Sequence, residues 1–162
     1  MNTRRFPYKV ERVLRIAGWT GEKSDTITVR LPEGYTLFPA VEEILKEFGG
    51  LEIGHDEEGY RILHDEFYIS PWNSGTVYGD PNARTEDGYR LYPFGLMCDR
   101  QGFLLVDERG HVYALFEIRF NRVAKTFDEA IIKLVLGVRF WLSEEIQAQD
   151  MVDRMAKDTN YA

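Results

Sequence analysis

The sequence predicts an α+β domain in which helices pack against a mixed, mainly antiparallel sheet with a central hairpin. Three observations support this fold class. Residues 102–116 form an apolar stretch that is interrupted by Asp107-Glu108-Arg109-Gly110, a typical tight turn between two strands. Apolar residues at helical spacing occur separately before and after this hairpin. Glycine and proline residues separate the segments, as expected for short connections.

The hairpin itself is predicted to lie inside the sheet. Phe103 and Leu105 would point to one face and Leu104 and Val106 to the other, yet all four side chains are apolar. A strand without a polar face needs cover on both sides. We therefore expect a central position with at least partial cover of both faces.

Two amphipathic helices are predicted in the first part of the chain. Residues 7–17 begin with a proline, repeat apolar side chains at helical spacing and end before Gly18. Residues 39–48 also begin with a proline, alternate an apolar with a charged face and end at two glycines.

The remaining segments before the hairpin are predicted to be extended or irregular. Residues 26–31 alternate like a short edge strand or an extended connection, and the pattern leaves both open. Extended segments are expected at 51–53 and at 60–70, followed by a long surface loop or broken helix at 71–90. A strand is expected at 92–98, with a proline and a glycine that indicate an edge or a bulge.

Two helices are predicted after the hairpin. Thr126 and Glu129 match the capping-box pattern, so a helix should run over 127–136 and stop at Gly137. A further helix is expected over 138–157. We therefore expect a domain at residues 1–137, with residues 138–162 as a helical extension packed on the same domain.

Length and composition agree with a single soluble domain. The chain has 162 residues, enough for a full core without disulfides, and 44% of them are hydrophobic. Its one cysteine, Cys98, cannot form an internal disulfide, so a cytoplasmic location with a buried free thiol is expected. The sequence contains neither a signal peptide nor an apolar run long enough for a membrane span, so no membrane contact is expected.

The negative charge is concentrated in one part of the chain. Residues 52–87 contain nine acidic and two basic side chains, an excess that equals the net charge of −7. Such an acidic region argues against nucleic acid as a direct ligand and favours a basic partner. An acidic surface that only keeps the protein soluble is an equally open alternative.

No catalytic, metal or cofactor site is predicted. His55, His64 and His111 lie far apart without a zinc-binding pattern, and no cysteine cluster is present. The sequence contains no GxSxG motif, no phosphate-binding loop and no dinucleotide fingerprint. Without a nucleophile, base and oxyanion site that belong together, an enzyme is not the preferred interpretation.

Several short motifs occur in a characteristic order. These are Ala17-Gly18-Trp19, Pro39-Ala40, Glu47-Phe48-Gly49-Gly50-Leu51, Tyr92-Pro93-Phe94-Gly95, Gly102-Phe103-Leu104, Asp107-Glu108-Arg109-Gly110-His111-Val112-Tyr113, Thr126-Phe127-Asp128-Glu129-Ala130 and Leu136-Gly137. With these motifs, residues 10–137 resemble the third subgroup of the SUKH superfamily. The chain departs from the pattern around residues 52–89 and by the extra helix after Gly137.

The resemblance implies a bacterial immunity protein that neutralises a cognate polymorphic or contact-delivered toxin domain, often a nuclease or deaminase. The motifs are structural, so no catalytic residue is carried over. Combined with the acidic region and its aromatic side chains, the resemblance leads to a predicted surface for a basic toxin domain, formed by Asp56, Glu57, Glu58, Asp65, Glu66, Trp72, Tyr78, Asp80, Glu86 and Asp87.

Alternatives remain open at this point. A general interaction or regulatory adaptor of the same fold would have no toxin gene beside it. A small hydrolase that uses His64 or His111 with nearby carboxylates would lose activity on substitution of the histidine. The sequence also leaves open whether the last helix supports a homodimer.

Overall fold

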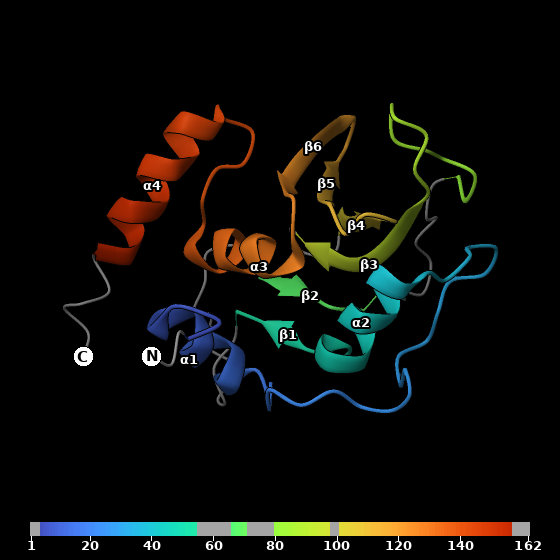
Figure 1. The fold of residues 1–162 in the computed structure, drawn as a ribbon, viewed down its shortest axis with the longest axis horizontal. Coiled ribbons are helices and arrows are strands. Elements are labelled where there is room, and N and C mark those ends of the chain that lie inside the picture. Colours follow the sequence, from blue (N-terminus) through green and yellow to red (C-terminus); the bar gives the residue numbers. More distant parts are fainter. Residues whose placement is uncertain (1–3, 55–65, 71–79, 98–100, 157–162) are drawn as a thin grey trace.

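The computed structural model describes residues 4–54, 66–70, 80–97 and 101–156, and they form an α+β fold (Figure 1). The helices are α1 (Tyr8–Ile16), α2 (Pro39–Phe48), α3 (Phe127–Leu136) and α4 (Glu144–Ala156). The strands are β1 (Glu52–Ile53), β2 (Phe67–Tyr68), β3 (Leu91–Met97), β4 (Gly102–Asp107), β5 (Val112–Phe116) and β6 (Arg119–Ala124). The predicted fold class is confirmed.

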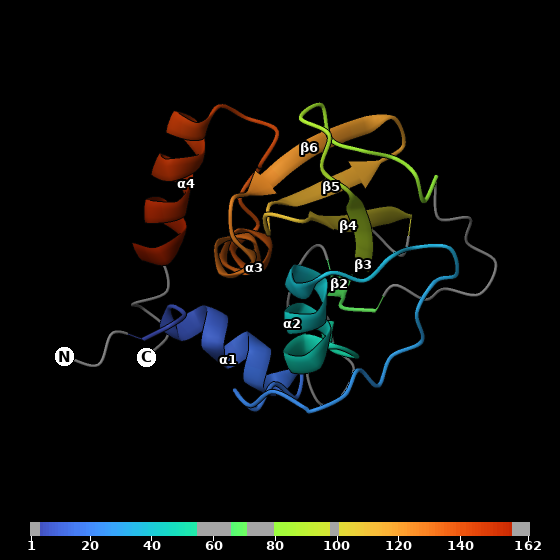
Figure 2. The ribbon, with the colours of Figure 1, turned by 45° about the vertical axis from the view of Figure 1, so that its right-hand side comes forward.

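The strands form a single sheet in the order β1-β2-β3-β4-β5-β6, and each described strand pairs antiparallel with the next. The β4–β5 hairpin therefore lies inside the sheet, as predicted. Figures 1 and 2 place α1, α2 and α3 together on one side of this curved sheet, while α4 stands at the outer end next to α3.

The two faces of the hairpin are covered to different degrees. Leu104 and Val106 of β4 are fully buried and belong to the main core beneath the helices. Phe103 and Leu105 on the opposite face are half-buried. The predicted partial cover of both faces is confirmed, because alternate side chains of β4 enter two different environments.

An aromatic cluster joins the helices beneath the sheet. The ring of Phe48, at the end of α2, lies 4.8 Å from that of Phe127 in α3 and 5.9 Å from the stacked ring of Trp19. Phe6, just before α1, meets Trp19 edge-on at 5.5 Å. Because these rings come from three separate parts of the chain, the cluster fixes how α1, α2 and α3 pack.

Helix α3 has the predicted cap at both ends. The Thr126 hydroxyl accepts a hydrogen bond from the Glu129 amide at 3.2 Å, and Gly137 ends the helix with a φ of +74°. The Glu129 carboxylate lies 3.4 Å from the Lys133 ammonium. The start of the helix is therefore capped by the threonine side chain, while the Glu129 carboxylate pairs with Lys133.

Replacing Thr126 with alanine should lower the free energy of unfolding by about 1 kcal/mol, because one amide in the first turn of α3 loses its acceptor. Urea unfolding followed by circular dichroism would measure this change. Thr28→Ala, at an exposed position of the irregular connection before α2, is the matched control and should have little effect. Equal effects of the two substitutions would contradict the capping role.

Two parts of the fold differ from the sequence prediction, and in a third the structure decides between two alternatives that the sequence left open. Strand β6 was not predicted at all, and residues 26–31 adopt the extended connection rather than a strand. The last helix begins at Glu144 and not at residue 138, because Ser143 starts it: the Ser143 carbonyl and hydroxyl accept the amides of Gln147 and Ile146, at 2.9 and 3.4 Å.

Helix α4 is attached to α3 through polar contacts. The buried Lys133 ammonium donates to the Gln147 side chain at 2.9 Å, and Arg154 donates to the Leu136 carbonyl at 2.9 Å. The proposed division of the chain at Gly137 stays a prediction. None of the helices in the described ranges is both long and apolar enough to cross a membrane.

Candidate partner-binding surface

Four of the ten predicted partner-binding residues lie within the described residues. Asp80, Glu86 and Asp87 are exposed, whereas Glu66 is only 6% exposed beside β2. The Glu66 carboxylate is therefore not presented to solvent. The other six predicted residues lie outside the described residues; they are Asp56, Glu57, Glu58, Asp65, Trp72 and Tyr78.

The exposed acids occupy an ordered segment that precedes β3. Asp80 accepts a hydrogen bond from the Asn82 amide at 2.8 Å, an Asx turn that fixes the start of the segment. Thr85 accepts the Gly88 amide through its carbonyl at 2.9 Å and the Tyr89 amide through its hydroxyl at 3.0 Å. The resulting turn carries Glu86 and Asp87 at its tip.

Arg109 holds this turn against the end of the hairpin. Its guanidinium lies 3.3 Å from the Asp87 carboxylate and 4.0 Å from the centre of the Tyr89 ring. Arg90 and Glu108 form a second ion pair between the same two segments. These contacts join the tip to the sheet, so the backbone of the turn and the Asp87 carboxylate are held in place before any partner binds.

Asp107 lies at the base of this arrangement and is completely buried. Its carboxylate accepts hydrogen bonds from the Arg109 side chain at 2.7 and 3.1 Å and from the Tyr113 hydroxyl at 2.9 Å. The backbone amides of Arg109 and His111 add two more, at 2.8 and 3.1 Å. Gly110, with a φ of +90°, closes the turn as predicted.

These contacts determine the protonation states of the cluster. Burial alone would raise the pKa of Asp107, but the hydrogen bonds from Arg109, Tyr113 and the two amides outweigh it and lower the pKa. Burial, followed by the hydrogen bond to Asp107, raises the pKa of Tyr113 to about 12. Asp107 is therefore a charged acceptor at neutral pH and Tyr113 a neutral donor.

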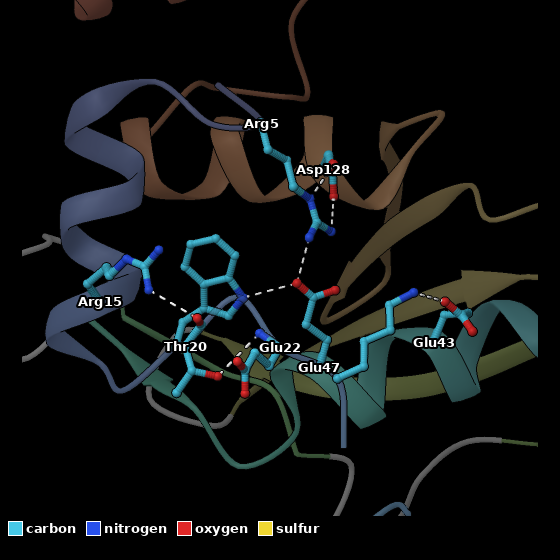
Figure 3. Close-up of polar contacts among 9 residues, drawn as sticks. Arg5, Arg15, Thr20, Glu22, Glu43, Glu47 and Asp128 are labelled. Atoms are coloured by element: carbon cyan, nitrogen blue, oxygen red, sulfur yellow. Dashed lines mark hydrogen bonds and ion pairs between the residues drawn. The ribbon is translucent and has the colours of Figure 1, made fainter. Parts of the chain in front are cut away.

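A second polar cluster joins the segment before α1 to α2 and α3 (Figure 3). Arg5 donates to both oxygens of Asp128 at 2.8 and 2.9 Å and to Glu47 at 2.5 Å, and the Trp19 indole donates to the same Glu47 oxygen at 3.1 Å. A cleft of about 260 Å³ opens beside it. The charges in this cluster pair with one another, so the cluster serves the fold.

Sequence reasoning missed both charged clusters. Asp107 and Arg109 were interpreted only as turn residues, although an acid and an arginine two positions apart at a hairpin turn are a usable signal. No local signal could reveal Arg5 and Asp128, which are 123 residues apart.

Of the two histidines named for an alternative hydrolase, only His111 is among the described residues, and His64 lies outside them. Burial, with a further contribution from nearby Arg109, lowers the pKa of His111 below its usual value. Within the described ranges, no group of three His, Cys, Asp or Glu side chains is arranged to hold a metal ion.

Comparison with known proteins identifies the family. The sequence model of the SUKH-3 immunity protein family matches residues 6–137, most of the chain. The chain belongs to this family. The SUKH-3 match begins in the aromatic cluster and ends at the cap of α3, so α4 lies beyond it. No curated protein and no solved structure gives a significant match. SUKH-3 membership indicates a role in toxin immunity and, in general terms, a toxin as partner.

Proposed function

We propose that this SUKH-3 protein acts in the cytoplasm as an immunity protein that binds a cognate toxin domain and performs no chemistry of its own. The toxin is a nuclease or deaminase of a polymorphic or contact-dependent system, with a basic surface. Family membership supports the immunity role. The acidic character of the chain supports the sign of the partner's charge.

The observation that carries the proposal is the anchored acidic turn. Glu86 and Asp87 are exposed at its tip, and Arg109 and Asp107 connect the turn to the hairpin. Nuclease substrate grooves are basic because they bind phosphates. Fixed carboxylates that meet such a groove accelerate association and lose little conformational entropy on binding. The remaining acids proposed for this surface, Asp56, Glu57, Glu58 and Asp65, belong to the same acidic part of the sequence.

Reversing the charge at the turn tip should weaken toxin binding. For Glu86→Lys with Asp87→Lys, we expect the association rate with the cognate toxin domain to fall by about tenfold or more at low salt, because electrostatic steering is lost. The difference should shrink as salt rises. Surface plasmon resonance measures the association rate. Survival of cells that co-express the toxin measures the protection that the variant still gives. The same reversal at Asp56, Glu57 and Glu58 should act in the same direction.

The matched control is Glu22→Lys with Asp25→Lys, which makes the same charge change at exposed positions outside the acidic region. It should retain nearly normal association and protection. Equal rates for both double variants would remove the turn tip from the binding surface. Failure of the unmodified chain to bind the toxin or rescue the poisoned cell would instead reject the immunity function and favour an adaptor.

A further inference from the structure

A groove of about 710 Å³ separates the outer edge of β6 from α4. Strand β6 is the last strand of the sheet, and α4 follows the part of the chain that matches the SUKH-3 family. Figures 1 and 2 show α4 standing clear of the sheet, with the segment that follows α3 leading from that helix to α4. One wall of the groove thus lies beyond the residues that match the family.

The polar groups at the base of the groove are already bonded. Lys133 donates to the Val123 carbonyl on β6 and to the Gln147 side chain, both at 2.9 Å. Gln147 in turn donates to the carbonyls of Phe140 and Leu142 at 3.0 and 2.6 Å. Because Lys133 already occupies the Val123 carbonyl, this main-chain acceptor of β6 is not available to an added strand.

The side chains left open in the groove are apolar. Trp141 is 58% exposed and Val152 on α4 is 56% exposed. Met151 and Met155 line the same wall of α4 and are partly buried. Tryptophan and methionine are enriched in protein interfaces, and flexible methionines adapt to the shape of a bound helix.

Three basic and two acidic side chains line the groove. Two of the bases are paired with the two acids: Arg122 lies 3.0 Å from Glu144, and Lys133 lies 3.4 Å from Glu129. Lys125 is exposed and forms no ion pair within the described ranges. A ligand with carboxylates beside an apolar face would therefore complement both the rim and the wall.

We propose that this groove binds an amphipathic helix of a protein partner, with its apolar face on Trp141, Met151 and Val152 and its acidic side chains toward Lys125. The bonded edge carbonyl favours a helix over a strand, and the rim selects acidic over basic helices. This site is independent of the acidic turn and has the opposite charge preference, so it does not rest on the toxin-binding proposal.

The test uses the full chain and three labelled helical peptides. One carries leucine at positions i, i+3, i+4 and i+7 with glutamate elsewhere, the second replaces glutamate by lysine, and the third scrambles the acidic peptide. In fluorescence anisotropy, the acidic amphipathic peptide should bind about tenfold tighter than either of the other two. Val152→Asp and Lys125→Glu should each weaken its binding by about tenfold, because they add like charge to the groove.

Ile146→Asp is the matched control. Ile146 is 50% exposed on α4 but does not line the groove, so this variant should bind like the unmodified chain. Circular dichroism verifies that all variants are folded. Absence of binding, equal binding of the scrambled or basic peptide, or equal effects of Val152→Asp and Ile146→Asp would overturn the proposal. A dimer in solution that Val152→Asp dissociates would make a second copy the occupant and would also overturn it.

Discussion

Replacing Asp107 with alanine is expected to lower the free energy of unfolding by about 3 kcal/mol, because the substitution leaves buried donors without their charged acceptor. The Tyr113 hydroxyl, two backbone amides and the Arg109 guanidinium all donate to this one carboxylate. Arg109 also holds Asp87, so the acidic turn should lose order in the same variant. Urea unfolding measures the first effect, and amide exchange of residues 85–89 measures the second.

The pH dependence provides a separate check of this role. The pKa of Asp107 is lower in the folded protein than its ordinary value of about 4, so its contribution to stability is fully present above that value. The contribution is lost as pH falls below about 4, toward the folded pKa. In the Asp107→Asn variant, the free energy of unfolding should fall less between neutral and acidic pH, because no carboxylate at position 107 becomes protonated. An unchanged stability profile between pH 2 and 5, roughly the range over which carboxylates titrate, would contradict the assignment. Asp80→Ala, at an exposed Asx turn, is the control for loss of an aspartate.

Phe48→Ala should have an effect of similar or larger size, about 3–5 kcal/mol, because it leaves a cavity where α1, α2 and α3 meet. The Phe48 side chain is almost completely buried and contacts the rings of Phe127, Trp19 and Phe6. Thermal and urea unfolding measure the loss, and Phe48→Leu should recover part of it by filling some of the volume.

Phe120→Ala is the matched control for the aromatic cluster. Phe120 lies on the edge strand β6, where its exposed ring stacks on Tyr113 at 4.9 Å. Its loss should cost about 1 kcal/mol or less, because little apolar surface leaves the core. If Phe120→Ala lowered the free energy of unfolding as much as Phe48→Ala, the special contribution of the aromatic cluster to helix packing would be contradicted.

The parts of the fold that the sequence predicted correctly are those with local signals. Two apolar runs around Asp107 and Gly110 indicate the hairpin, and the threonine cap and the terminal glycine indicate α3. Strand β6 has no such signal. Only its last residues, Val123 and Ala124, are buried, and the preceding turn uses Glu117 with a φ of +56° where glycine or asparagine would have been recognisable.

The last helix illustrates a different source of error. Apolar residues between 138 and 142 extended the helical pattern, yet Ser143-Glu144-Glu145 is itself a start signal, with a capping side chain and acids in the first turn. Trp141, one of these apolar residues, is exposed beside the groove. Periodicity finds apolar positions but does not reveal which of them the fold covers.

The negative charge of the candidate site could be predicted from the sequence, but the contacts that hold its side chains in place could not. The concentration of acids marked Asp80, Glu86 and Asp87, which are exposed. Glu66 is buried, although side chains alternate between faces and its neighbour Phe67 in β2 is buried as well, so no signal in the sequence indicated its burial. The anchoring of the turn by Arg109 depends on a contact between segments that are 22 residues apart, and spacing in the sequence does not encode such a contact.

The strand order has a consequence for how the protein reaches its native state. From β3 to β6, each strand pairs with its immediate successor in the sequence, so this half of the sheet can zip together through successive hairpins with small loop-closure entropy. The ion pair between Arg5 and Asp128 joins the beginning of the domain to α3, so it can form only after α3 has formed. In a nascent chain on the ribosome, we expect these strands to pair early. Helix α1 would pack in its native position only after α3 has left the ribosome.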